Sequence, residues 1–254
     1  MINYIKKQTK ADKLAYVAHS MGTTIMFRLA AENPSFVEDS ISSFIGIGPV
    51  IVPAGSKAVV VETVLPIQDY LYDMLHFAHY YVIGQPNKFS SYAINYICSA
   101  VPTVCMDFEK LIASNDIELS APDRFEAYMG HYPSGGSLNV VFHYLQQMRR
   151  DEVTVGFDYG DEAKNIERYG SARVPTISMK GLKHLKVPVS LFVGTHDILS
   201  TPEDDRKIKK VLGKSLHQYH EVSADHLSLL IGKDMTYFTH TVMNTLEFQA
   251  PPYY

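Results

Sequence analysis

The sequence is short of the features that mark several large classes of protein. Its 254 residues include only two cysteines and carry a formal net charge of −4. The longest apolar runs are broken by Asp, Lys, Gly or Pro and fall short of the roughly 20 residues that a transmembrane helix needs. A weakly acidic chain is not expected to depend on nucleic acid or on an anionic membrane surface, because both attract basic proteins. We therefore expect no nucleic-acid partner and no membrane span.

The first ten residues are polar where a secretory signal peptide would be apolar. Lys6, Lys7 and Lys10 fall within them, whereas a signal peptide carries an apolar stretch of about 7–15 residues at this place. We therefore expect no signal peptide here. The rest of the composition is ordinary, with 46% hydrophobic and 20% charged residues. It indicates a globular chain that buries a sizeable core, as one α/β domain or as one domain with an insertion.

The two cysteines, Cys98 and Cys105, are close in the sequence and leave two interpretations open. They could form a disulfide in an oxidising compartment, or they could be two free buried thiols. Two thiols with no histidine nearby make an incomplete metal site. Several other histidines show no spacing typical of metal ligands: His131, His143, His184, His217, His220 and His240. We expect neither a metal nor a cofactor.

The most informative motif is a serine at the junction between a predicted strand and a predicted helix. Leu14–Val17 is typical of a short buried strand, and Thr23–Glu32 has the apolar spacing of a helix. Ser20 lies between them, with the small residues Ala18 and Gly22 two positions away on either side. This arrangement predicts a nucleophile elbow, a turn so tight that the two backbones nearly touch. The strained turn would raise the serine hydroxyl above the sheet.

Oxyanion stabilisation is the second property that the elbow predicts. The first N–H groups of the helix, including the backbone N–H of Met21, would point towards the place where negative charge develops during attack on a carbonyl group. We therefore expect Met21 to supply an oxyanion donor through its backbone.

The pattern along the rest of the chain predicts a doubly wound α/β domain with an insertion. Strands are expected at Ile41–Val50, Val187–Val193 and Leu216–Val222, and helices at Pro202–Leu212 and Met235–Phe248. Residues 52–186 are rich in Tyr, Met, His and Phe with irregular helical periodicity, which is typical of an inserted, mostly helical subdomain. The first part of the α/β core would then be residues 1–51, and its second part residues 187–254.

An acid and a base follow the last two predicted strands. Asp197 comes at the end of one strand and His226 at the end of the next. Because the carboxyl ends of parallel strands meet at one edge of the sheet, both would lie near Ser20. A hydrolase triad needs a base within reach of the serine and a carboxylate that holds the imidazole, and the order serine, acid, histidine is typical of α/β-hydrolases. We predict Ser20, Asp197 and His226 as the catalytic residues.

Nearby aspartates and histidines are less suitable as the catalytic acid or base. The side chain of Asp225 should point away from the imidazole that follows it, and Asp204 and Asp205 are expected to be solvated on a helix. We expect His19 to pack beside the serine rather than act as its base, and His196 to order its loop.

The residues together resemble the acid lipases of the α/β-hydrolase fold, which include gastric and lysosomal acid lipases. The resemblance covers nearly the whole chain and rests on these segments: AHSMGTT (18–24) followed by Asn33-Pro34-Ser35, HYPSGGSLNVVFHYLQQ (131–147), Phe157-Asp158-Tyr159-Gly160, Tyr169-Gly170, Val187-Pro188-Val189, His196-Asp197 and Asp225-His226-Leu227. The insertion segment, HYPSGGSLNVVFHYLQQ, is the most specific of them, because generic hydrolases lack it.

The resemblance implies a serine lipase that needs no cofactor and cleaves neutral lipid esters, such as triacylglycerols or sterol esters, at a lipid–water interface. It implies that the insertion is a helical cap over the active site. A cysteine pair in the matching part of that cap forms a disulfide, which favours this pairing for Cys98 and Cys105. It also suggests a secreted or lysosomal protein.

The chain departs from the family in two respects. Met21 stands where many members have Gln. The family's N-terminal portion, with the first strands of the sheet and a His-Gly loop that supplies a second oxyanion donor, has no counterpart before Leu14–Val17. We therefore expect this strand to have an open edge, and a partner chain or a further N-terminal segment to complete the sheet. The alternative function is a non-catalytic, lipase-fold subunit or fragment with a structural or interaction role.

Overall fold

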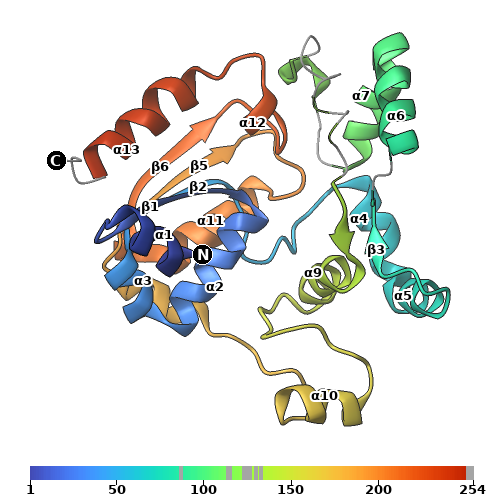
Figure 1. The fold of residues 1–254 in the computed structure, drawn as a ribbon, viewed down its shortest axis with the longest axis horizontal. Coiled ribbons are helices and arrows are strands. Elements are labelled where there is room, and N and C mark those ends of the chain that lie inside the picture. Colours follow the sequence, from blue (N-terminus) through green and yellow to red (C-terminus); the bar gives the residue numbers. More distant parts are fainter. Residues whose placement is uncertain (86–87, 113–115, 122–127, 129–130, 132–133, 250–254) are drawn as a thin grey trace.

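A four-stranded parallel sheet forms the centre of the fold, in the order β1-β2-β5-β6 (Figure 1). The computed structural model describes residues 1–254 except 86–87, 113–115, 122–127, 129–130, 132–133 and 250–254, so Tyr132 and Pro133 of the specific insertion segment lie outside the described residues. The strands are β1 (Leu14–Ser20), β2 (Ile41–Pro49), β5 (Val189–Gly194) and β6 (Leu216–Val222). Parallel strands joined by helices confirm the predicted α/β class.

Helices cover both faces of this sheet because successive residues of a buried strand point to opposite sides. On one face of the sheet, Phe44 and Leu191 pack in a cluster with residues from the helices. Their neighbours Ile45 and Phe192 pack in a second cluster on the other face. The helical elements of the core are α1 (Ile2–Thr9), α2 (Met21–Glu32), α3 (Pro34–Ser40), α11 (Pro202–Leu212), η4 (Gly213–Ser215), α12 (Ser228–Ile231), the π-helical η5 (Tyr237–Val242) and α13 (Met243–Gln249).

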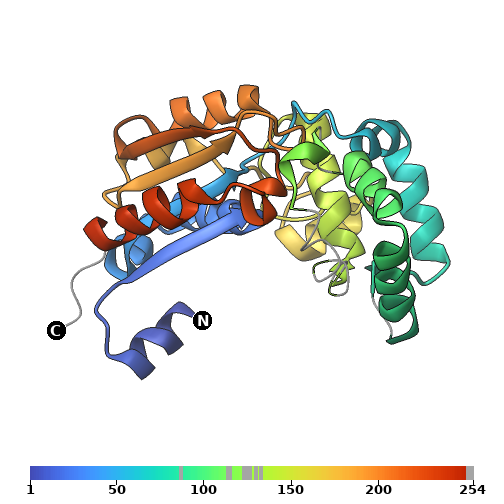
Figure 2. The ribbon, with the colours of Figure 1, turned by 90° about the horizontal axis from the view of Figure 1, so that it is seen from above.

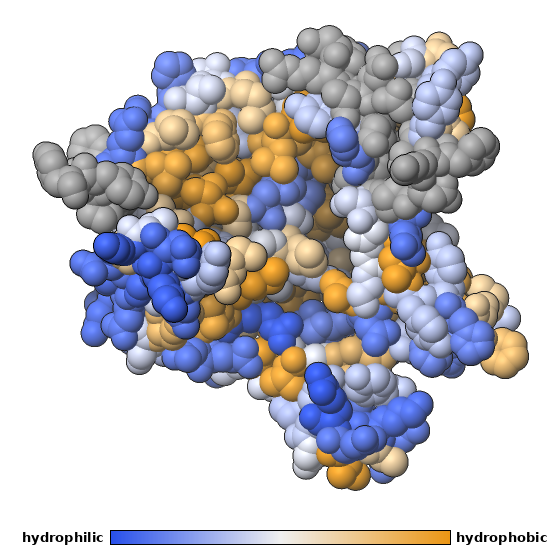
Figure 3. Space-filling model, viewed as in Figure 1, coloured by the Kyte–Doolittle hydropathy of each residue, from blue (hydrophilic) through white to orange (hydrophobic). Residues whose placement is uncertain are grey.

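The four strands differ in how well they are covered. Nearly every residue of β2 and β5 is buried, as expected for central strands of a parallel sheet. In contrast, β1 lies at the edge of the sheet, and its residue Val17 is exposed. Apolar surface gathers on the core between α1 and α13 (Figure 3). Met243, the first residue of α13, is also exposed. The open edge expected for this strand is thus present in the structure.

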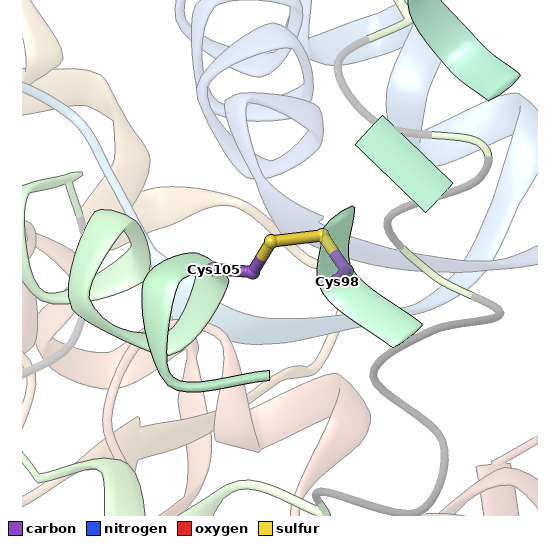
Figure 4. The surroundings of a disulfide bond; sticks show 2 residues. All are labelled: Cys98 and Cys105. Carbon is purple, nitrogen blue, oxygen red and sulfur yellow. A yellow bond between two sulfur atoms is a disulfide. The ribbon is translucent and has the colours of Figure 1, made fainter. Parts of the chain in front are cut away.

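Residues 52–186 form a largely helical segment beside the sheet (Figures 1 and 2). Its elements are α4 (Val59–Val64), η1 (Leu65–Ile67), α5 (Gln68–Phe77), β3 (Val82–Ile83), α6 (Lys88–Ala100), α7 (Pro102–Ile112), η2 (Ile117–Leu119), β4 (Gly136–Ser137), α9 (Leu138–Arg150), α10 (Glu162–Tyr169) and η3 (Met179–His184). It has a small core of its own around Leu138 and Phe142. A disulfide between Cys98 and Cys105 joins α6 to α7 (Figure 4).

This segment contacts the core just beyond the carboxyl ends of the strands. The Lys57 N–H donates to the carbonyl of Ile198, which follows β5, and the Ala121 N–H donates to the carbonyl of Ile231 in α12, which follows β6. Both contacts are at the edge of the sheet where Ser20 ends β1.

The predicted helix Met235–Phe248 is present at nearly these bounds, and its first part is the π-helical η5, which leads directly into α13. The Thr239 hydroxyl donates to the carbonyl of Met235, and such contacts from threonine to the preceding turn loosen a regular helix.

The expectation that Asp204 and Asp205 are solvated is wrong, because these residues are only 2% and 1% exposed. Asp204 is buried because its carboxylate accepts the Gly55 N–H at 3.0 and 3.2 Å, a contact from the distant insertion that the helical pattern does not reveal.

Candidate active site

Ser20 occupies a strained turn between β1 and α2. Its backbone has φ 52° and ψ −121°, a conformation that residues other than glycine rarely adopt. A Cβ atom added to Gly22 would lie 3.1 Å from the Cβ of Ala18, so the strand and the helix approach too closely for larger side chains. This is the geometry of the predicted elbow, and it accounts for the small residues on either side of the serine.

Ser20, His226 and Asp197 form a continuous chain of hydrogen bonds. The Ser20 Oγ lies 2.7 Å from His226 Nε2, and His226 Nδ1 lies 2.7 Å from Asp197 Oδ2. His226 and Asp197 are 2% and 3% exposed. The second oxygen of Asp197 accepts the N–H groups of Leu199 and Ser200, both at 2.8 Å, which leaves Oδ2 directed at the imidazole.

Close contact between the ends of β5 and β6 brings Asp197 and His226 together. The Thr195 N–H donates to the Val222 carbonyl, and the His196 N–H donates to the Ala224 carbonyl. A Cβ atom on Gly194 would lie 2.5 Å from the Ala224 oxygen, so this approach requires glycine. His196 therefore helps to order the loop through its backbone.

His19 contacts both the backbone and the ring of His226. Its Nε2 lies 2.9 Å from the backbone oxygen of His226, and the two rings are 4.7 Å apart. Burial, together with the nearby imidazole of His226, lowers the pKa of His19 to about 4, so the ring is neutral at neutral pH and its Nε2–H donates to the carbonyl. The sequence did not predict this contact of His19 with the backbone of His226.

Asp225 points away from the imidazole, as predicted. Its Oδ1 accepts the N–H of Ser228 at 2.7 Å, which holds the start of α12. The carboxylate that contacts His226 is therefore that of Asp197 and not the one adjacent in sequence.

Met21 begins α2, directly after the serine. The first N–H groups of a helix have no partner within it and point out of its N-terminus, where the helix dipole also favours negative charge. The Met21 N–H is therefore available at the elbow, while its side chain is half exposed.

Two threonines that the sequence did not single out secure the elbow to the end of β2. The Val50 N–H donates to Thr23 Oγ1 at 2.8 Å, and the Thr24 hydroxyl donates to the Val50 carbonyl at 2.9 Å. Both threonines are buried. The signal that could have revealed them is two adjacent polar residues in the first turn of a helix that was expected to be buried.

Neither a metal site nor a membrane-spanning helix is present in the described part of the chain. Within it, no three His, Cys, Asp or Glu side chains group so that they could hold a metal ion. No helix among the described residues is long and apolar enough to cross a membrane.

Comparison with known proteins supports the class of protein that the fold and the site indicate. A family model described as the alpha/beta hydrolase fold matches residues 1–93. Lipase member N of Homo sapiens is 26% identical over 221 residues, which cover 86% of this chain and 53% of that protein. Gastric triacylglycerol lipase of Rattus norvegicus is 24% identical over 235 residues, covering 92% of this chain and 58% of that protein.

A third relative, from Crotalus adamanteus and provisionally assigned as a lysosomal acid lipase/cholesteryl ester hydrolase, is 25% identical over 240 residues, which cover 92% of this chain and 57% of that protein. The chain spans about half the length of the curated relatives it matches.

The fold of this chain is therefore that of the α/β-hydrolases. Within this class its relatives are the gastric and lysosomal acid lipases and related lipases, which confirms the resemblance that the motifs predicted.

Proposed function

We propose that this protein is a serine ester hydrolase that cleaves neutral lipid esters. The single observation that carries the proposal is the hydrogen-bond chain from Ser20 through His226 to Asp197, with both contacts at 2.7 Å. The names of the relatives, which include triacylglycerol lipase and cholesteryl ester hydrolase, support triacylglycerols or sterol esters as the substrate class.

In the proposed mechanism Ser20 Oγ attacks the ester carbonyl while His226 Nε2 accepts the hydroxyl proton. The Met21 N–H stabilises the resulting oxyanion. The imidazolium then gives its proton to the leaving alcohol, and an acyl-serine remains. Water attacks this ester with the same base and releases the fatty acid. Asp197 keeps the proton of the neutral imidazole on Nδ1, so that Nε2 is free to act as the base.

We propose that residues 52–186 are a helical cap inserted into a core made of residues 1–51 and 187–254. The contacts of the insertion beyond the carboxyl ends of β5 and β6 support this assignment. One face of α5 supports contact with a lipid–water interface, because Tyr70 and Phe77 are 73% and 87% exposed there.

The disulfide between Cys98 and Cys105 supports an oxidising compartment, since such bonds persist there. Together with the gastric and lysosomal relatives, it leads us to propose a secreted or lysosomal location. Thiol alkylation of the protein taken from its native source should leave both cysteines unmodified until a reductant is added.

The central experiment is covalent labelling with a fluorophosphonate, followed by hydrolysis of a chromogenic fatty-acyl ester. We expect a single adduct on Ser20 that is absent in Ser20→Ala, while Ser35→Ala, an exposed serine of α3, is labelled normally. Labelling is the more sensitive readout, because it needs the serine and its base but not turnover. Hydrolysis and labelling that survive in Ser20→Ala would refute the proposal, and a complete absence of both would favour the non-catalytic alternative.

A further inference from the structure

A cavity of about 730 Å³ lies away from the catalytic residues, between α11, η3 and the chain that follows α9. Neither Ser20 nor His226 lines it. Its volume is within the range of about 300–1,000 Å³ that is typical of pockets for small molecules. The cavity can therefore be considered as a binding site separate from the proposed active site.

Much of the wall of this cavity is apolar. Ile51 and Val52 come from the chain after β2, Val153 from the chain after α9, and Ile208 and Val211 from α11. Of these, Val153 and Ile208 are buried. A small inorganic anion would leave this apolar surface in contact with water, whereas a ligand with an alkyl chain would cover it.

Lysines from two helices also line the cavity: Lys180 and Lys183 on η3, and Lys207 and Lys210 on α11. Apart from Lys207, none of them forms an ion pair with another residue that the structure describes. Three ammonium groups are thus available to an anionic ligand.

The acidic residues of the cavity do not cancel this charge. The Lys207 ammonium lies 3.3 Å from Asp204 and 3.9 Å from Asp151, so these carboxylates are already engaged. Glu152 is the remaining acidic group in the lining. With four lysines and three carboxylates in the lining, the formal charge of the cavity is +1.

We propose that this cavity binds a long-chain fatty acid, with the alkyl chain on the apolar wall and the carboxylate among Lys180, Lys183 and Lys210. A neutral ester would not use the ammonium groups, and phosphate would not use the wall. The proposal rests on the proposed function only for the source of the acid, which ester hydrolysis at Ser20 would release. Binding itself does not require catalysis.

The absence of tryptophan from the sequence permits a local test. Val52→Trp would place a single indole in the cavity wall, and dibrominated stearic acid, used below its critical micelle concentration, quenches an indole that it contacts. We expect saturable quenching that the methyl ester of the same acid does not produce. Tyr4→Trp, an exposed position on α1, serves as the control and should not be quenched.

The role of the lysines is tested in the Val52→Trp variant. Lys180→Gln, Lys183→Gln and Lys210→Gln together should weaken binding of the acid about tenfold or more, the loss expected for removing charge-assisted contacts. The matched control replaces Lys7, Lys10 and Lys214, which are exposed and outside the cavity, by Gln and should bind as before. If the Val52→Trp variant does not fold, Ile177→Trp reports from the same cavity.

Equal quenching by the acid and its methyl ester, or equal affinity in the two lysine variants, would overturn the proposal. Quenching of the Tyr4→Trp control would reveal non-specific association and would overturn it as well. Because the reporter does not depend on Ser20, binding of the acid in a protein without esterase activity would separate failure of the proposed function from failure of this inference.

Discussion

The core around the sheet and the inserted segment differ in which side chains they bury and which they expose. At the carboxyl ends of the strands, Asp197 and His226 are almost completely buried and hydrogen-bonded to defined partners. In the insertion, large aromatic residues such as Phe77 are mostly exposed. Burial and hydrogen bonds fix the orientation of a few polar groups, whereas exposed apolar side chains provide contact area without fixed geometry.

The contrast extends to how each region is held together. The core relies on two clusters of buried apolar side chains on either side of the sheet. The insertion has a smaller cluster around Leu138 and, in addition, the disulfide between α6 and α7. Small cores need such a covalent link more than large ones do. Changes in the core should therefore cost more stability, and changes in the insertion should be more local.

The largest expected effect concerns the buried polar groups of the core. Asp197→Asn should lower kcat/KM for a chromogenic ester about 10⁴-fold, because an amide does not hold the imidazole in the required tautomer. The matched control is Asp225→Asn, which changes the carboxylate adjacent to His226 in sequence and keeps a side-chain oxygen that can accept the Ser228 N–H. We expect near-normal activity from the control. Similar losses in both variants would show that general disturbance, and not the contact with His226, is responsible.

The next largest effect compares packing in the two regions. Leu191→Ala removes a completely buried side chain from the central strand β5 and should lower the free energy of unfolding by about 2–5 kcal/mol. Phe77→Ala removes an exposed side chain and should change it by no more than about 0.5 kcal/mol. Denaturant titration of the two variants measures both values. A large cost for Phe77→Ala would mean that α5 is covered by another part of the protein in solution.

Removal of the disulfide should have an intermediate and local effect. The bond closes a loop with a sequence separation of 7, for which chain entropy gives a stabilisation of about 2–2.5 kcal/mol. The double variant Cys98→Ala/Cys105→Ala should therefore exchange amide hydrogens faster in α6 and α7, while exchange in β2 and β5 stays as in the unaltered protein. Faster exchange in these strands would show that the two regions unfold as one cooperative unit.

The last comparison concerns a buried carboxyl group in the core. Asp205 is buried, and neither of its carboxyl oxygens has a hydrogen-bond partner among the described residues. Burial, together with nearby carboxylates such as Asp197, raises the pKa of Asp205 to about 9. The folded protein thus keeps a proton on this group that the unfolded chain releases above pH ~4.

Since the unfolded state binds fewer protons, Asp205 makes folding less favourable as pH rises from about 4 to about 9. Asp205→Asn removes this cost and should raise the free energy of unfolding by about 1–3 kcal/mol at pH 7, with the gain shrinking towards pH 4. Urea midpoints of both proteins at the two pH values measure it. A gain that is the same at both would show that protonation of Asp205 is not its cause.

Local patterns predicted the α/β core and the elbow because the relevant information lies within a few residues. The apolar run ending in Ala18, the small residue Gly22 and the helical spacing after Ser20 are all contiguous. The ends of consecutive parallel strands also meet at one edge, so the proximity of Asp197 and His226 followed from their positions alone.

The features that were missed depend on contacts between distant segments. Asp204 is buried by the N–H of Gly55, which is 149 positions away, and His19 contacts the backbone of His226, 207 positions away. The helical pattern of α11 cannot distinguish an aspartate that accepts such a bond from one in water.

The positive φ of Ser20 also means that thermal robustness and reactivity are in conflict at this one residue. Any side chain in that conformation costs on the order of 1–2 kcal/mol relative to glycine. Glycine at position 20 would relax the turn, but the same change would remove the hydroxyl on which the proposed mechanism depends.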